Sequence, residues 1–271
     1  MLVVKAGGRA LMENMDNILD SIAAAVKRGD PVVFIHGGGD LVTEYSKRLG
    51  VEPRFVVSPS GVRSRYTTRE ELEVFVMVLG GLLNKSIAVG LARRGLRPVG
   101  LTGVDGLVLL AQRRKRIVVL DEETGRRRVI PGGYTGKIVS VNTGLLDSLI
   151  AGGYTPVLAP IAYDPEEATL LNVDGDQAAA RVAAALRAST LIVLTDVDGL
   201  LLDGRLVERL TVSEARRLVE EGRVGKGMNR KLIELAMAVE EGLGRAVIAN
   251  AAKPDPLAAA LRGEGTVIEP G

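Results

Sequence analysis

The residues with the clearest chemical potential lie together at positions 172–177, in the order Asn-Val-Asp-Gly-Asp-Gln. This stretch sets an amide and two carboxylates on a tight turn and leads into an alanine-rich segment that favours a helix. Asp176 or its neighbour can cap that helix, whose free N–H groups and positive dipole end attract an anion. We interpret the stretch as the middle of a phosphoryl-transfer site. An Asx turn with a helix N-cap is the plainer alternative for these residues alone.

Two glycine-bearing turns follow predicted strands near the start of the chain. Residues 2–5 form a short apolar strand that ends in Lys5-Ala6-Gly7-Gly8, and residues 32–35 form an apolar strand that ends in His36-Gly37-Gly38-Gly39. Adjacent glycines let backbone N–H groups approach a carboxylate or phosphate closely. Open α/β sheets place their sites at the carboxyl ends of strands, which is where both turns fall.

Three further polar stretches complete the set of candidates. Arg65 lies in a polar loop, and its planar guanidinium suits a carboxylate. A second acidic turn, Thr195-Asp196-Val197-Asp198-Gly199, follows a predicted strand at residues 190–194. Residues 225–231, Gly-Lys-Gly-Met-Asn-Arg-Lys, open a predicted helix that carries Lys231.

Composition excludes several classes of chemistry. The chain of 271 residues has no cysteine and one histidine, His36. Disulfides, a cysteine nucleophile and a Cys/His zinc site are therefore excluded, and any Ser-His-Asp triad would have to use His36. We interpret His36 as a structural histidine at a strand end rather than as a general base. Neither a Walker A motif nor the protein-kinase motif set is present.

Strands and helices alternate along the whole chain, without an evident linker or repeat. Further strands are expected at residues 54–57, 97–101, 155–159, 190–194, 246–248 and 266–268, and helices at 15–27, 40–49, 68–94, 141–150, 212–220 and 225–241. This alternation predicts an α/β fold with a mainly parallel sheet and helices on both faces. We expect no membrane association, because no apolar run approaches the roughly 20 residues of a membrane span. No signal peptide is evident, so a cytoplasmic location is expected.

The net charge of +2 is unevenly distributed. Residues 111–137 contain eight basic and three acidic residues, a net charge of +5, which leaves −3 for the rest of the chain. We predict β-hairpins there, with a turn at Glu123-Thr124-Gly125 and a basic edge that includes Arg113, Arg114, Arg127 and Arg128. A solvated face is the plainer interpretation, and an acidic partner is the alternative that the asymmetry favours. Nucleic acid is disfavoured because aromatic residues for base stacking are scarce.

Together these motifs resemble those of the amino acid kinase family, of the acetylglutamate kinase type. The matching motifs are Lys5-x-Gly7-Gly8, His36-Gly37-Gly38-Gly39, Arg65-Tyr66-Thr67, Asn172-x-Asp174-x-Asp176-Gln177-Ala178-Ala179, Asp196-Val197-x-Gly199 and Gly227-Met228-x-x-Lys231. The resemblance implies an open three-layer αβα sandwich with a mainly parallel central sheet. It also implies one domain over 1–271, with an N-terminal lobe of about residues 1–165 for the acyl substrate and a C-terminal lobe of about 166–271 for the nucleotide. A homodimer is the family expectation.

The resemblance further implies a role for each motif. Lys5 and Lys231 would flank the transferring phosphoryl group, and Asp176 would orient both lysines. The substrate would be held by Gly38, Gly39, Arg65 and Asn172, and ATP would be contacted by Gly7, Gly8, Asp196, Val197, Gly199 and Met228. Mg²⁺ would arrive bound to the nucleotide, with no metal site on the protein itself. A carboxylate nucleophile is ionised at neutral pH, so this chemistry needs positioning and charge stabilisation rather than a general base.

Two features depart from typical acetylglutamate kinases. Residues 61–67 are Gly-Val-Arg-Ser-Arg-Tyr-Thr rather than Gly-Leu-Arg-Val-Thr, and the basic hairpin with Gly-Tyr-Thr-Gly-Lys at 133–137 is unusual. Both are similar to the archaeal kinases that act on α-aminoadipate or glutamate attached to an acidic amino-group carrier protein, LysW. By this similarity the product would be an acyl phosphate in lysine or arginine biosynthesis, and the basic hairpin would dock the carrier.

Three alternatives remain open from the sequence. They are a kinase of free N-acetylglutamate; a superfamily member acting on aspartate, carbamate, a nucleoside monophosphate or isopentenyl phosphate; and a non-catalytic binding or sensor protein. The arginine loop and Asn172 argue against the second. Lys5 and Lys231 argue against the third, because a pure binder needs no pair of phosphoryl-flanking lysines. Aminoadipate and glutamate are not distinguished, since one methylene changes binding by only about 1–3 kcal/mol.

Overall fold

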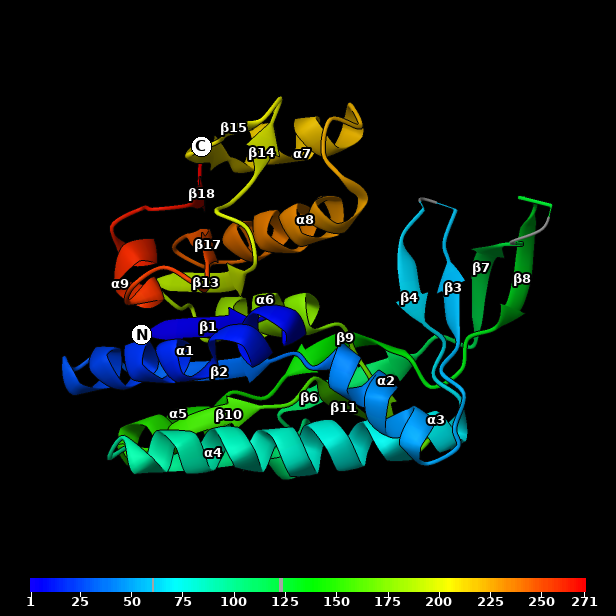
Figure 1. Cartoon of the computed structure of the whole chain (residues 1–271), viewed down its shortest axis with the longest axis horizontal. Coiled ribbons are helices and arrows are strands. Elements are labelled where there is room, and N and C mark those ends of the chain that lie inside the picture. Colours follow the sequence, from blue (N-terminus) through cyan, green and yellow to red (C-terminus); the bar gives the residue numbers. More distant parts are fainter. Residues whose placement is uncertain (60, 122–123) are drawn as a thin grey trace.

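Eight strands form the central sheet, and the first strand of the chain lies inside it (Figure 1). The computed structural model describes residues 1–59, 61–121 and 124–271, apart from the side chain of Lys226. From edge to edge the strands are β16 (Arg209–Thr211), β18 (Thr266–Glu269), β17 (Ala246–Asn250), β13 (Thr190–Thr195), β1 (Leu2–Ala6), β2 (Val32–His36), β10 (Thr155–Leu158) and β5 (Pro98–Leu101). Neighbours run parallel, except that β17 and β18 are antiparallel. Because β1 and β2 are buried on both faces, their sequences are apolar apart from Lys5 and His36 rather than alternating.

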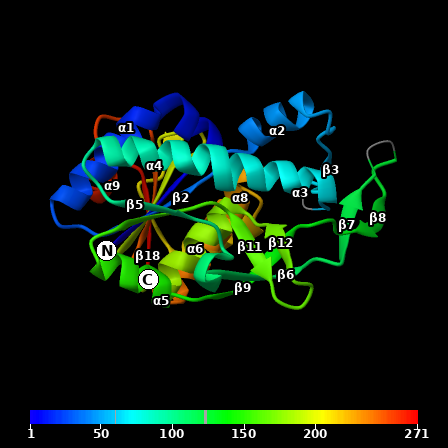
Figure 2. The same ribbon diagram turned by 90° about the horizontal axis from the view of Figure 1, so that it is seen from below.

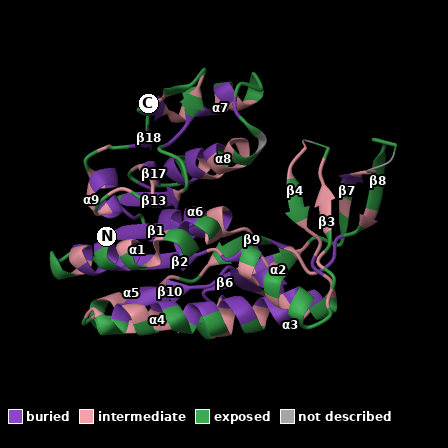
Figure 3. Ribbon diagram, viewed as in Figure 1, coloured by how far each residue is buried: buried purple, intermediate pink, exposed green. Residues whose placement is uncertain are grey.

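Helices cover both faces of this sheet. Leu2 and Val4 of β1 belong to one hydrophobic core, and Val3 belongs to the other, as alternating strand residues require. The helices of the first layer are α1 (Gly8–Lys27), α2 (Gly39–Arg48), α9 (Pro256–Leu261) and a long run over residues 69–93. Those of the second layer are α5 (Gly144–Ala151), α6 (Gly175–Ala185), α7 (Val212–Glu220) and α8 (Lys226–Glu240). Buried residues follow the sheet and the helix sides that face it (Figure 3), so the predicted αβα sandwich is confirmed.

The long helical run extends over Arg69–Arg93 and has three segments. They are α3 (Arg69–Phe75), the π-helical segment η1 (Val76–Leu83) and α4 (Asn84–Arg93). Among the described helices, this one alone is long and apolar enough to cross a membrane, which the sequence-based expectation of no such stretch overlooked. Its buried side chains, such as Phe75, Leu79 and Ile87, belong to the core of the first layer.

Two four-stranded sheets extend the central body. One contains β12 (Thr169–Asn172), β11 (Ile161–Asp164), β6 (Leu109–Arg113) and β9 (Gly136–Val141). The other contains β4 (Arg63–Arg65), β3 (Phe55–Val57), β7 (Arg116–Leu120) and β8 (Arg127–Pro131). We call this second sheet the flap, because it projects from the body in both views (Figures 1 and 2). Minor elements are η2 (Asp105–Leu107) and the hairpin of β14 (Leu201–Leu202) and β15 (Arg205–Leu206).

The basic region folds differently from the predicted row of hairpins. β7 and β8 do form a hairpin, but β6 pairs with β9 and β11. Leu109 and Ala111 draw β6 into the core, whereas most residues of β7 and β8 are exposed or half-buried. The predicted turn at Glu123-Thr124-Gly125 includes Glu123, which lies outside the described residues. The lobe boundary predicted near residue 165 falls between β11 and β12, which pair with each other.

Candidate active site

Two lysines from distant parts of the chain meet at one carboxylate. Nζ of Lys5, near the end of β1, lies 2.8 Å from Oδ1 of Asp176. Nζ of Lys231, in α8, lies 2.7 Å from Oδ2 of the same side chain. Asp176 belongs to the first turn of α6. The fold therefore brings the three residues predicted to act together into direct contact.

The electrostatics of this cluster follow from burial and mutual charge. Side-chain exposure is 9% for Lys5, 18% for Asp176 and 12% for Lys231. Burial alone would raise the pKa of Asp176, but the charges and hydrogen bonds of the two lysines hold that pKa well below its usual range. The pKa of Lys231 is lowered by burial and by the charge of Lys5. Two cations against one anion leave a positive excess in a poorly hydrated place, which favours a bound anion.

Asp174, rather than Asp176, caps α6. Its Oδ1 accepts hydrogen bonds from the backbone N–H groups of Asp176 and Gln177, both at 3.0 Å. Its other oxygen lies 3.5 Å from Nη2 of Arg230, which adds a cation beside the same turn. Because Asp174 caps the helix, the carboxylate of Asp176 is free to contact the two lysines.

The glycine turns after β1 and β2 touch each other. A Cβ on Gly8 would lie 2.8 Å from the backbone nitrogen of Gly38, and a Cβ on Gly37 would lie 2.8 Å from the nitrogen of Gly8. Gly38 also has a φ of +154°, which side chains rarely allow. A Cβ on Gly7 would lie only 3.8 Å from Nζ of Lys5. Glycine at these positions thus keeps bare backbone beside the lysine.

Two cavities meet at these turns. The larger, of about 610 Å³, is lined by Lys5 and Asp176 and by residues of the flap. The smaller, of about 320 Å³, is lined by Asp196 and the start of α1. Gly8 and Gly39 line both cavities. The arrangement can hold one reactant beside Lys5 and Asp176 and a second in the adjoining smaller cavity.

The guanidinium of Arg65 lines the larger cavity but already has partners in the protein. Its Nη1 forms a buried ion pair with Glu71. Its Nη2 donates to the carbonyl of Gly39 at 2.9 Å and to Oγ1 of Thr43 at 2.5 Å. Burial raises the pKa of Glu71, and the hydrogen bond and charge of Arg65 oppose that rise. Arg65 therefore ties the start of α2 to α3.

Asn172 ends β12 and lines the same cavity. Its Nδ2 donates to Oγ1 of Thr67 at 2.9 Å, and its backbone N–H donates to the carbonyl of Tyr134 at 3.0 Å. The predicted arginine loop and Asn172 are thus joined by a direct hydrogen bond.

His36 lies in the core, and its ring is fully buried. Nδ2 of Asn84 donates to its Nε2 at 3.2 Å, and its Nδ1 lies 3.1 Å from the carbonyl of Gly37. Burial lowers the pKa of His36 to about 4, so the ring is neutral near pH 7. This environment agrees with the interpretation of His36 as a structural residue.

Asp196 borders the smaller cavity at the end of β13. It accepts a hydrogen bond from Oγ1 of Thr195 at 3.0 Å, and it lies 3.1 Å from Nη1 of Arg9. The Thr195 hydrogen bond is the main cause that lowers the pKa of Asp196. In the same loop Asp198 accepts from Nδ2 of Asn250 at 3.1 Å.

The three other residues predicted to contact the nucleotide, Val197, Gly199 and Met228, lie outside both cavities. Val197 is exposed on the loop after β13, and Gly199 occupies a turn with a φ of +155°. Met228 is half-buried in the first turn of α8 and packs on the core of the second layer. None of the three lines either of the two cavities described above.

A model of the amino acid kinase family matches residues 1–250. The chain belongs to this family. It is 49% identical over 271 residues to the [LysW]-aminoadipate/[LysW]-glutamate kinase of Saccharolobus solfataricus, covering 100% of both chains. It is 48% identical over 269 residues to the protein of the same name from Sulfolobus acidocaldarius, covering 99% of this chain and 100% of the other. The resemblance inferred from the motifs is confirmed.

A solved structure supports the same conclusion about the fold. The N-acetylglutamate synthase of Neisseria gonorrhoeae, complexed with coenzyme A and N-acetyl-glutamate, superposes with a TM-score of 0.81 at 25% identity. The match covers 100% of this chain and 59% of that one. The fold class expected for an amino acid kinase is confirmed by this superposition.

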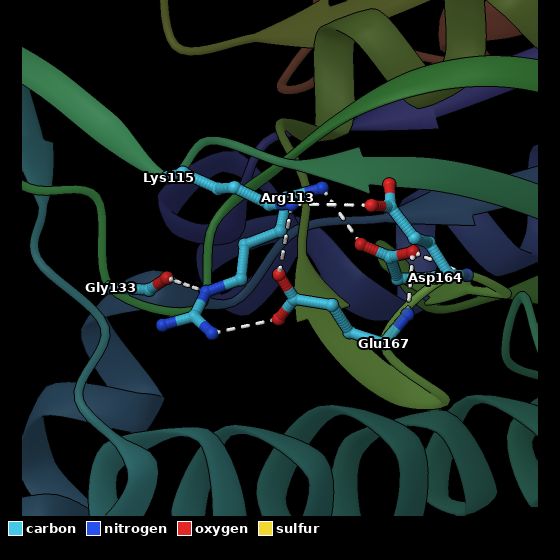
Figure 4. A network of polar contacts seen from close by, with 6 residues as sticks. Arg113, Lys115, Gly133, Asp164 and Glu167 are labelled. Carbon is cyan, nitrogen blue, oxygen red and sulfur yellow. Dashed lines mark hydrogen bonds and ion pairs between the residues drawn. The ribbon is translucent and has the colours of Figure 1, made fainter.

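The four arginines predicted to dock a carrier do not share one surface of this amino acid kinase. Arg113 points inward, as Figure 4 shows: its Nη1 lies 2.8 Å from Oε2 of Glu167. Arg114 lines the larger cavity. Arg127 and Arg128 are exposed neighbours on β8, so their side chains extend toward opposite faces of the flap.

The side chain of Arg113 holds the base of the flap. Its Nε donates to the carbonyl of Gly133 at 2.6 Å, and its guanidinium lies 4.3 Å from the ring centre of Tyr134. Its backbone N–H donates to Oδ2 of the buried Asp164 at 2.9 Å. These contacts join β6, the β11–β12 turn and the segment that leads from β8 to β9 (Figure 4).

One face of the flap combines basic and apolar side chains. Val118 and Val129 lie directly opposite each other on β7 and β8 and are 45% and 60% exposed. Arg116 and Arg127 lie two residues away on the same face. Arg63 of β4 lines the larger cavity, with its guanidinium 3.8 Å from the ring centre of Phe55. Within the described part of the chain, no carboxylate forms an ion pair with Arg63, Arg116 or Arg127.

Several residues of the site were missed by the sequence motifs. Arg9 directly follows the Lys5 motif and Arg230 directly precedes Lys231, so adjacency to a motif could have indicated both. Thr68 and Glu71 have the spacing of a helix capping box. Oγ1 of Thr68 does accept from the Glu71 N–H at 3.2 Å, but the Glu71 carboxylate pairs with Arg65. No local pattern indicates that pairing.

Proposed function

We propose that the protein uses ATP to phosphorylate the side-chain carboxylate of α-aminoadipate or glutamate linked to an acidic amino-group carrier protein. The product is an acyl phosphate for lysine or arginine biosynthesis. The observation that carries the proposal is the contact of Lys5 and Lys231 with the largely buried Asp176, because Lys5 and Asp176 line the larger cavity, which adjoins the smaller one at Gly8 and Gly39. The substrate class is supported by the names of relatives that are 48% and 49% identical over essentially the whole chain.

The chemistry needs no base from the protein. An oxygen of the substrate carboxylate attacks the γ-phosphorus of ATP, the bond from that phosphorus to the β–γ bridging oxygen breaks, and ADP leaves. The attacking carboxylate is already ionised at neutral pH. Lys5 and Lys231 stabilise the charge on the transferring group and the leaving oxygen, and Asp176 fixes both ammonium groups beforehand. Preorganised charge of this kind acts without reorganisation during the reaction.

The glycine turns suit the phosphates of ATP. Gly7 and Gly8 expose backbone beside Lys5 and line the smaller cavity with Asp196. In the proposal these residues contact the nucleotide phosphates, and Val197, Gly199 and Met228 lie toward the rest of the nucleotide. Mg²⁺, carried in on the phosphates, neutralises part of their charge. In residues 1–59, 61–121 and 124–271, no cluster of three histidines or carboxylates suited to a metal was found.

The acyl substrate occupies the larger cavity in this proposal. Gly38, Gly39 and Asn172 line it and present backbone or amide groups. Because both terminal nitrogens of Arg65 have internal partners, Arg65 acts here mainly by holding Gly39 in place. Arg63 adds a cation on the flap side of the cavity.

The flap is the surface proposed for the carrier. A carrier-linked substrate must place its acyl end in the larger cavity while the carrier stays outside, and flap residues form one wall of that cavity. Arg114, Arg116 and Arg127 are exposed there, and positive charge accelerates encounter with an acidic protein. Val118 and Val129 add an apolar centre to the same face. Arg113 does not belong to this proposed docking surface; it supports the base of the flap through its contacts with Gly133 and Glu167.

The test is acyl-phosphate formation, trapped with hydroxylamine, on three substrates. We expect turnover on carrier-linked aminoadipate or glutamate and little on free N-acetylglutamate. Turnover on N-acetylglutamate alone would establish the alternative kinase, and no turnover on any substrate would favour a binding or sensor protein.

Paired charge reversals test the docking surface. Arg116→Glu with Arg127→Glu should raise the KM for the carrier-linked substrate at low salt and leave the KM for ATP unchanged. The matched control is Lys27→Glu with Arg93→Glu, two exposed cations on helix ends far from the flap (Figure 1). Equal effects of the two pairs would mean that total charge, not this surface, matters.

We further propose a cytoplasmic homodimer. The outer side of the helical run Arg69–Arg93 leaves Met77, Leu82 and Val89 exposed, and a second copy could cover this apolar face. Sedimentation of Leu82→Glu against the unmodified protein tests the dimer. An unmodified protein that sediments as a monomer would contradict it.

A further inference from the structure

Gln177 bridges two elements on either side of α6. Its Oε1 accepts from the backbone N–H of Ile138 in β9 at 3.1 Å, and its Nε2 donates to Oε1 of Glu234 in α8 at 3.1 Å. A backbone N–H only donates and a carboxylate only accepts, so the amide has one possible orientation. Among side chains of this size, the amide alone serves both partners.

The Gln177 link runs beside the catalytic contact. Asp176 and Gln177 are adjacent on α6, and Lys231 and Glu234 are three residues apart and so share one side of α8. α6 packs against both α8 and β9 (Figure 2). Two contacts between the same two helices, at 2.7 Å and 3.1 Å, fix the rotation of α8 as well as its distance.

The environment of Glu234 makes this link important to the helix. Its Oε2 is buried, and no hydrogen-bond partner for it exists among the described residues. The hydrogen bond from Gln177 is therefore the contact that holds this carboxylate in place. A buried carboxylate that loses its donor moves toward water, and α8 would move with it.

We infer that Gln177 is a positioning residue that, through Glu234, sets α8 and hence Lys231 against Asp176. The inference rests on the proposed role of Lys231 at the phosphoryl group. A displacement of about 1 Å in a positioned catalytic group can cost about 100-fold in rate. Gln177 itself is buried and does not line either cavity, so its effect on the reaction is indirect.

A swap of the two side chains provides the test. Gln177→Glu sets two carboxylates against each other, and we expect kcat to fall 10- to 100-fold while KM for ATP and acyl substrate changes less than threefold. In the double variant with Glu234→Gln, the carboxylate at position 177 still accepts from the Ile138 N–H, and the amide at position 234 donates to that carboxylate, so most of kcat should be recovered. Gln177→Asn, which shortens the amide without adding charge, covers the case in which Gln177→Glu does not fold. It should also lower kcat rather than raise KM.

Controls separate this inference from the proposed function. Glu240→Gln, an exposed change on the same helix, should keep kcat. If Lys231→Met retains activity, the proposed role of Lys231 is wrong. If Lys231→Met is inactive but Gln177→Asn keeps kcat, or the swap restores nothing over folded Gln177→Glu, the positioning role is overturned while the proposed function stands.

Discussion

Nζ of Lys231 donates to Oδ2 of Asp176 at 2.7 Å, although 55 positions separate the two residues in the chain. The contact joins α8 to α6, and Lys5 of β1 reaches the other oxygen of the same carboxylate. One buried anion between two buried cations holds both ammonium groups in place and leaves one net positive charge. That charge is what a transferring phosphoryl group needs.

Asp176→Asn should therefore impair both stability and rate. The change leaves two buried ammonium groups without a counter-charge, and breaking a buried pair costs roughly 3–5 kcal/mol of unfolding free energy. We expect kcat to fall by about 100-fold or more. Asp174→Asn is the matched control, because asparagine caps a helix as well as aspartate does. Similar losses in both variants, measured by urea unfolding and steady-state kinetics, would assign the effect to the turn rather than to the lysine contacts.

Gly8→Ala should push apart the two glycine turns that follow β1 and β2. The new Cβ would lie 2.8 Å from the backbone nitrogen and 2.9 Å from Cα of Gly38, and backbone cannot yield as a side-chain tip can. We expect kcat/KM to drop at least 10-fold, with loss of ATP affinity measured by calorimetry. Gly81→Ala, which has open space around its Cβ, should instead stabilise its helix by about 0.5–1 kcal/mol. Unchanged ATP affinity in Gly8→Ala would mean that this turn does not contact the nucleotide.

Glu71→Gln should loosen the start of α2. It removes the buried partner of Arg65, which holds the Gly39 carbonyl. We expect a loss of roughly 3 kcal/mol in unfolding free energy and a higher KM for the acyl substrate at unchanged KM for ATP. Glu73→Gln, two residues along α3, breaks an exposed pair with Arg69 and should cost less than about 1 kcal/mol. If chemical denaturation gives the same loss of unfolding free energy for Glu71→Gln and Glu73→Gln, the buried Arg65–Glu71 pair contributes no more to stability than an exposed pair.

His36 should make stability depend on pH. The pKa of His36 is lowered by burial from 6.5 to about 4, so between these values the unfolded chain binds a proton that the folded chain does not. Unfolding free energy should therefore fall as pH drops from 6.5 toward 4, by roughly 3 kcal/mol in total, and this contribution should be constant above pH 6.5. His36→Gln should lack it. The difference between the two proteins in urea unfolding at pH 7.5, 5.5 and 4.5 isolates the histidine; a constant difference would mean that its ring titrates normally.

Much of the fold is readable from local sequence. The apolar strands β1 and β2 and the helix Val212–Glu220 follow from residue patterns that need no tertiary information. The order of the motifs indicated that Lys5, Asp176 and Lys231 belong to one site. Lys5 lies near the end of a strand, but Asp176 and Lys231 lie in helices, so the contact itself depends on the packing of α6 against α8 and β1.

Other features depend on packing between residues far apart in the chain and could not be predicted from the local sequence. β6 joins β9 rather than β7, because its buried residues pair with a strand that begins 23 residues after β6 ends. The inward turn of Arg113 depends on Glu167, and the Gln177 link depends on Glu234. In each case the partner is far along the chain, and neither residue type indicates the pairing alone.

The most direct test of the role of Lys231 in phosphoryl transfer is the rate of hydroxylamine-trapped acyl phosphate formation in Lys231→Met at saturating ATP and carrier-linked substrate. Lys27→Met, which changes an exposed lysine, is the matched control. We predict that kcat falls by about 100- to 1000-fold in Lys231→Met, with ATP still bound and the fold intact by circular dichroism, while Lys27→Met is unaffected. A kcat within threefold of the unmodified protein in a folded Lys231→Met would contradict the assignment of Lys231 to the phosphoryl group.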